Sequence, residues 1–168
     1  LTLPTDYESA ISALVSRRSG GASDSPDYDL SQAVKTLRQS RGALAAKADS
    51  AALGRVFEAQ LAVLKALSAV DSRLCVDFLY GGASEAFLKF SATNRALVSD
   101  LAIAGLEAIL DGKEKNIART TPTESDFQMF ETSLRQNGVG ASEIGALLDG
   151  KTPDPPIPDD RMCAAGKT

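Results

Sequence analysis

The chain has 168 residues, of which 43% are hydrophobic and 24% charged, and its formal net charge is −4 with a pI near 4.9. This acidic balance disfavours nucleic-acid binding, because the broad basic surface that contacts phosphates is missing. The chain has no His, which removes the commonest general base and imidazole metal ligands, and no apolar run of about 18 residues that would span a membrane.

The chain starts at Leu1 without the charged and apolar regions of a signal peptide, which indicates a removed leader or an excised domain. A first helix is predicted from Thr5, since Thr5 and Glu8 have the spacing of a capping box. A second helix is predicted from about Asp29, after a loop rich in Ser, Asp and Pro. Their apolar stripes consist of Tyr7, Ile11, Leu14 and Val15 in the first helix and of Leu30, Val34, Leu37 and Leu44 in the second.

The strongest helical pattern occupies residues 51–69, after a predicted cap at Asp49 and Ser50. Its apolar residues cover a wide arc of the helix, which is typical of a helix that several others contact. We therefore expect this helix to lie at the centre of the fold. The residues of the arc are Leu53, Val56, Phe57, Leu61, Val63, Leu64, Leu67 and Val70.

Further helices are predicted after this central one. The first of them is short and ends at Gly81-Gly82, because glycine adopts the left-handed conformation of a helix C-terminus without steric cost. The segment 112–121 is polar and is expected to bend the chain back. The predicted helices between these points span residues 72–80, 84–90 and 93–111.

The C-terminal part of the chain begins with a strong helix start signal at residues 122–126, in which Thr123 is the predicted cap and acidic residues fill the first turn. Phe127, Phe130 and Leu134 then form a narrow apolar seam. A last short helix is predicted over residues 142–148.

The tail from Lys151 contains four prolines, which exclude a regular helix there. It is expected to lie extended along the bundle or to hang free up to Cys163. No segment of the sequence shows the sustained alternation of a half-buried strand. The sequence therefore predicts an all-α fold: one compact bundle of about six to eight helices over residues 1–150, with a Pro-rich extended tail over 151–168.

Cys75 and Cys163 lie too far apart in sequence for a metal-binding cluster. In an oxidising compartment they would form one disulfide, which would tie the tail to the helix over 72–80. The alternative is two unrelated thiols, and the sequence leaves both open. The apolar helix face and the nearby acids around Cys75 are typical of an inert structural thiol, which disfavours a nucleophilic role.

Aromatic side chains are concentrated around Gly81-Gly82, where four of the nine aromatic residues fall within positions 78–90. The first interpretation is a corner of the core where two short helices meet. The second is the lip of a groove or pocket for a ligand or a partner helix. The candidate binding residues are Phe78, Tyr80, Phe87 and Phe90, with Arg73 and Arg95 as the nearest arginines.

No residue pattern points to catalysis, a metal ion or a cofactor, so we expect a non-enzymatic protein that needs none. Glu107 and Asp111 share a helix face, but Lys113 and Lys115 lie close enough to neutralise them. An enzyme that works through carboxylates is therefore the last of three hypotheses.

The leading hypothesis is a helical interaction module that binds a protein partner, or a second copy, through an apolar helix groove. It would be the soluble part of an exported or membrane-anchored bacterial protein, in the periplasm or otherwise outside the cytoplasm. The second hypothesis is an extracytoplasmic domain that senses a small molecule. A cytoplasmic adaptor is the alternative location and role if both thiols are free.

Overall fold

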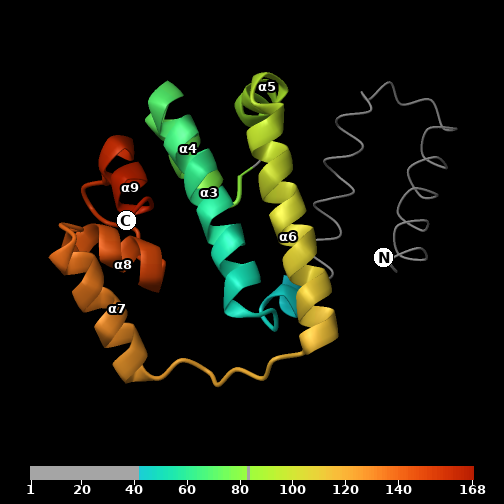
Figure 1. Cartoon of the computed structure of the whole chain (residues 1–168). Coiled ribbons are helices and arrows are strands. Elements are labelled where there is room, and N and C mark those ends of the chain that lie inside the picture. The colour runs from blue at the N-terminus through green and yellow to red at the C-terminus, as the bar shows by residue number, and fades with distance from the viewer. Residues whose placement is uncertain (1–41, 83) are drawn as a thin grey trace, which may run out of the picture.

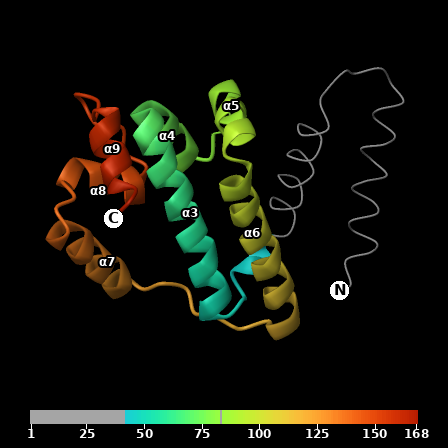
Figure 2. The same ribbon diagram turned by 45° about the horizontal axis from the view of Figure 1, so that its top comes forward.

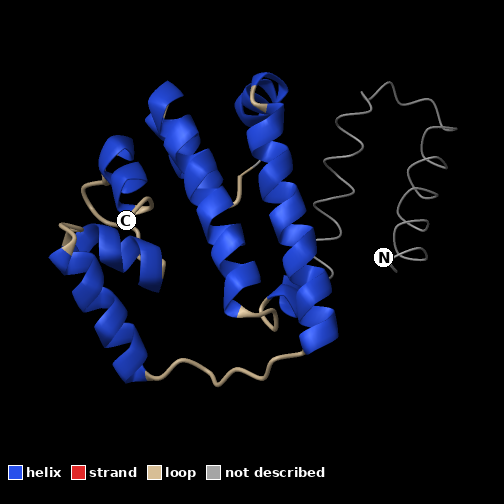
Figure 3. Ribbon diagram, in the orientation of Figure 1, coloured by secondary structure: helices blue, strands red, loops and turns tan. Residues whose placement is uncertain are grey.

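The computed structural model describes residues 42–82 and 84–168 (Figure 1). Within these ranges every regular element is a helix, which confirms the predicted all-α fold (Figure 3). The first predicted helix and residues 29–41 of the second lie outside the described residues, and residues 42–45 are helical. None of the described helices is both long and apolar enough to cross a lipid bilayer.

Apart from α9, which was not predicted, the described helices lie close to their predicted positions in the sequence. They are α3 (Ser50–Val70), α4 (Ser72–Leu79), α5 (Glu85–Thr93), α6 (Arg95–Lys115), α7 (Glu124–Gln136), α8 (Ala141–Asp149) and α9 (Asp159–Ala165).

The helix starts are fixed by side chains that cap them. Asp49 accepts a hydrogen bond from the Ala52 amide at 2.8 Å, where α3 begins. At the start of α7, Thr123 accepts from the Asp126 amide at 3.3 Å, and Asp126 accepts from the Thr123 amide at 2.7 Å. Each contact satisfies a backbone N–H group that has no partner inside the helix. The caps predicted at these two positions are confirmed.

The centre of the fold is α3, which lies beside α6 and also contacts α4 and α9 (Figure 1 and Figure 2). This confirms its predicted central place. The predicted apolar arc is too wide, because Phe57 is 65% exposed and Val70 is also at the surface. The main buried cluster draws on α3, α4, α5, α6 and α9, and consists of Val63, Leu64, Leu67, Leu74, Cys75, Phe90, Leu101 and Cys163.

The chain that precedes α3 crosses α6 where both carry small residues. Ala48, Ala52 and Ala108 form a second buried cluster at this crossing. Gly112 of α6 lies against the backbone of Leu44, with no room between them for a Cβ atom. The predicted bend begins later than Gly112, because α6 continues through this glycine to Lys115 and residues 116–121 are not helical. The absence of a side chain allows close packing rather than ending the helix.

A smaller group of helices, α7, α8 and α9, forms the C-terminal part of the fold. Its buried cluster consists of Leu134, Val139, Ile144 and Ala165. Residues 151–158 are not helical, as their prolines predict. The rest of the tail is not extended: it folds into α9, which the sequence analysis missed. Asp159 and Asp160 were the available signal, because acids in a first turn favour a helix start.

Cys75 of α4 and Cys163 of α9 form a disulfide, with 5.7 Å between their Cα atoms. Of the two alternatives that the sequence leaves open, the bonded pair is the one present. The bond joins positions 88 residues apart in sequence, so it fixes the C-terminal tail to the centre of the fold.

Candidate functional site

Three of the predicted aromatic residues come together beside the main buried cluster. The ring centroids of Phe78 and Phe87 are 5.3 Å apart, and those of Phe87 and Phe90 are 6.2 Å apart. Phe90 is buried, and the other two rings are half-buried against the same cluster. This is the geometry of a core corner, in which the rings stabilise the junction of α4, α5 and α6.

The remaining predicted site residues lie at the surface. Tyr80 is exposed at the C-terminal end of α4, outside the stack of phenylalanine rings. Arg73 lies in the first turn of α4 and Arg95 begins α6, and both are exposed. The structure thus brings together Phe78, Phe87 and Phe90, and Tyr80, Arg73 and Arg95 do not belong to this stack of rings.

A different apolar surface lies on α7. Phe127, Phe130 and Leu134 share one face of this helix, because positions i, i+3 and i+7 lie above one another. Leu134 is buried against Val139 and Ile144, whereas Phe127 and Phe130 are 51% and 52% exposed. We call Phe127 and Phe130 the α7 stripe. It continues the face of Leu134 beyond the point where other helices cover it.

Acidic side chains border the α7 stripe on both sides. At 100° per residue, Glu124 and Glu131 lie on one side of it and Asp126 lies on the other. Hydrogen bonds from the Thr123 amide and hydroxyl hold the pKa of Asp126 below its ordinary value, so this carboxylate is ionised at neutral pH. The one basic residue of α7 is Arg135, whose guanidinium contacts Glu131 at 2.5 Å.

The opposite face of α7 is also open to solvent. A flat, open patch on this face is lined by side chains of α7 alone. The lining is polar apart from Met129, which is 65% exposed. In the described part of the chain, Leu134 is the one buried residue of this helix. The lining residues are Ser125, Gln128, Met129, Thr132, Ser133 and Gln136.

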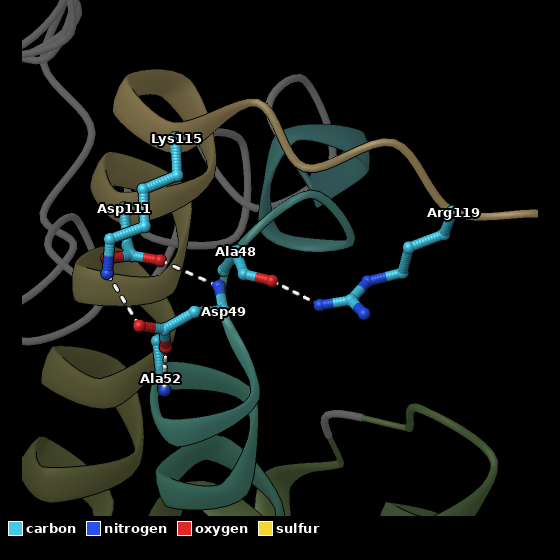
Figure 4. A network of polar contacts seen from close by, with 6 residues as sticks. All are labelled: Ala48, Asp49, Ala52, Asp111, Lys115 and Arg119. Atoms are coloured by element: carbon cyan, nitrogen blue, oxygen red, sulfur yellow. Dashed lines mark hydrogen bonds and ion pairs between the residues drawn. The ribbon is translucent and has the colours of Figure 1, made fainter.

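The carboxylates considered for catalysis are held in ion pairs. Figure 4 shows Lys115 between Asp111 and Asp49, at 2.5 Å from each, with the Asp49 amide donating to Asp111 at 2.8 Å. The ammonium group lowers the pKa of both carboxyls below their ordinary value of 3.8. Glu107 contacts Arg55 at 2.7 Å. Asp49 and Asp111 are thus ionised at neutral pH, and their ion pair with Lys115 gives these two carboxylates a structural explanation.

Further contacts join the chain that precedes α3 to the chain that follows α6. Arg119 donates to the carbonyl groups of Ala46, at 2.8 Å, and of Ala48 (Figure 4). The Ile117 amide donates to the carbonyl of Lys47 at 3.0 Å. These contacts satisfy carbonyl groups of a non-helical segment, so the network has a structural explanation.

Among the described residues, no group of three or more carboxylate or cysteine side chains is placed to hold a metal ion. Comparison with known proteins adds no assignment: no family model, no curated protein and no solved structure matches this chain. The candidate functional surface is the α7 stripe. Sequence reasoning identified its two apolar residues but gave no sign that they are exposed.

Proposed function

We propose that this protein is a non-enzymatic interaction module, and that the α7 stripe binds an amphipathic helix of a protein partner. The observation that carries the proposal is the exposure of Phe127 and Phe130 on a helix of which Leu134 alone is buried in the described part of the chain. Aromatic side chains with this spacing are the usual anchors when one helix packs against another.

The charges around the stripe support a partner of a particular kind. α7 carries three carboxylates and one guanidinium, and the guanidinium is already paired with Glu131. A partner helix with basic residues beside its apolar face would meet these carboxylates with complementary charge. A partner with acidic flanks would be repelled, so the rim selects between partners that have the same apolar face.

The proposal includes a location outside the cytoplasm. Its support is the Cys75–Cys163 disulfide, because such bonds form and persist in oxidising compartments. In such a compartment, the α7 stripe and its acidic rim would bind a partner within an extracytoplasmic assembly.

The binding test uses two designed helical peptides with the same leucine face, one flanked by lysines and one by glutamates. Fluorescence anisotropy of the labelled peptides measures binding to the intact oxidised protein. We expect saturable binding of the lysine peptide and binding of the glutamate peptide weaker by on the order of tenfold, because only the first complements the rim.

The decisive variants are Phe127→Ser with Phe130→Ser, and Met129→Ser as the matched control. Met129 is at least as exposed but lies on the opposite face of the same helix. The double variant should weaken binding of the lysine peptide by more than about tenfold, and the control should leave it unchanged. Equal losses in both, or no saturable binding to wild type, would refute the proposal. A wild-type dimer that the double variant dissociates would identify a second copy as the occupant instead.

A further inference from the structure

Among the described residues, helix α9 contributes to both of two buried clusters that share no other helix. Its Cys163 lies in the main buried cluster with residues of α3, α4, α5 and α6. Its Ala165 lies in the smaller cluster with Leu134, Val139 and Ile144 of α7, α8 and the turn between them. In Figure 1 and Figure 2, α9 lies beside both α4 and α8. The position of α7 relative to α3 therefore depends on α9.

On one side, α9 and the residues after it contact α4 and α3. Besides the disulfide to α4, the Lys167 ammonium donates to the Ser68 hydroxyl of α3 at 2.6 Å. Gly166 packs so closely on Leu79 that a Cβ atom would lie 2.9 Å or less from its methyl groups. On the α8 side, Arg161 forms an ion pair with the buried carboxylate of Glu143. Together these contacts hold the C-terminal group of helices against α4.

The disulfide is the one covalent contact in this set, and the helix that it holds is short. With seven residues, α9 is far below the length at which an isolated helix is stable in water. The chain before α7 is held to residues 46–48 as far as Arg119, and the residues from there to the start of α7 are not helical. Loss of the disulfide would leave α9 dependent on a few side-chain contacts.

We infer that the Cys75–Cys163 disulfide keeps α7 and α8 docked on the α3–α6 core, and that its reduction releases them together. Reduction requires a dithiol, which transfers two electrons and two protons. The S–S bond breaks, Cys75 and Cys163 become thiols, and the dithiol closes its own disulfide. As far as it concerns partner binding, this inference rests on the proposed function: released α7 would lose its fixed orientation and bind more weakly.

The burial of both cysteines limits the access of a reducing dithiol to the disulfide. Cys75 and Cys163 are fully or almost fully buried, so a dithiol meets the sulfur atoms only when α9 opens. Opening of a short terminal helix is a local event that leaves the core folded. Reduction should therefore be slow in the native protein and limited by this opening, whereas an exposed disulfide would react at once.

The test is hydrogen exchange, measured by mass spectrometry, on three samples: oxidised wild type, wild type reduced with dithiothreitol, and the Cys75→Ala/Cys163→Ala variant. We expect amides of residues 124–149 to exchange faster by on the order of tenfold in the last two samples, with α3 and α6 unchanged. The variant treated with dithiothreitol controls for effects of the reagent. The lysine-flanked peptide is then titrated into each sample.

The outcomes separate the two proposals. Faster exchange confined to α7, α8 and α9 supports the inference, even if the peptide binds no sample and the proposed function fails. Faster exchange across α3 and α6 as well would show that the bond stabilises the whole fold. Unchanged exchange would show that α7 and α8 stay docked without the bond. Either result overturns the inference. Peptide binding that weakens together with the release supports regulation of the site.

Discussion

The close approach of the chain before α3 to α6 gives a prediction in which two similar substitutions have opposite effects. Gly54 and Gly112 both lie inside helices, where alanine is preferred by about 1 kcal/mol per residue. A Cβ atom on Gly54 would meet nothing within 4 Å. A Cβ atom on Gly112 would overlap the Leu44 carbonyl and lie 3.0 Å from the Ala48 nitrogen.

These surroundings set the expected free energies of unfolding. Gly54→Ala should stabilise the protein by about 1 kcal/mol, since only the helix preference changes. For Gly112→Ala the overlap involves backbone atoms, which cannot rotate away, so the overpacking cost lies near the upper end of the usual range, about 3 kcal/mol. Subtracting the helix preference leaves a net destabilisation of about 2 kcal/mol.

Urea unfolding followed by far-UV circular dichroism measures both changes, and thermal unfolding gives a second reading. For a chain of this size, Gly54→Ala should raise the Tm by about 2–4 °C and Gly112→Ala should lower it by about 4–8 °C. If Gly112→Ala stabilises the protein as Gly54→Ala does, residues 44–48 do not lie against α6. If Gly54→Ala destabilises it, the helix-preference argument is wrong at this site.

Two further predictions concern the core and the ionic network. Leu67→Ala removes a fully buried side chain from the main cluster and should cost about 2–5 kcal/mol in urea unfolding; less than about 1 kcal/mol would mean that the core is elsewhere. Because the pKa values of Asp49 and Asp111 are lowered, their contribution to stability is complete above their ordinary value of 3.8 and declines as the pH falls through the lowered values. Wild type should therefore lose more stability than Lys115→Met between about pH 5 and pH 2, and equal losses would show that the network contributes nothing.

The helices of the central bundle could be predicted because their signals are local. Asp49 and Thr123 cap helices through contacts that span three residues, and the sequence contains both partners of each contact. The Leu64 and Leu67 positions repeat at helical spacing and are buried. Such patterns specify where a helix begins and which face is apolar, whatever else the chain does.

Features that depend on a second segment could not be predicted in the same way. In the sequence, Gly112 looks like the glycine that ends a helix. Its actual role, to leave room for the backbone of Leu44 against α6, depends on a segment far away in the sequence. Phe57 belongs to the apolar pattern of α3 and yet is exposed, because the pattern does not say how many helices cover that side. The disulfide is a similar case, since the spacing of two cysteines is compatible with a bond and with two thiols.

The exposure of the α7 stripe has a geometric cause of the same kind. The turn at Gly138, which has a φ of 86°, brings α8 back against the end of α7 nearest that turn, where Leu134 lies. Figure 1 shows that α8 crosses this end of α7 rather than lying along the whole helix. Leu134 is therefore covered, while Phe127 and Phe130 stay half-exposed toward the other end. In sequence all three residues belong to one seam, and only the direction in which α8 leaves the turn separates its buried end from the end that we propose binds a partner.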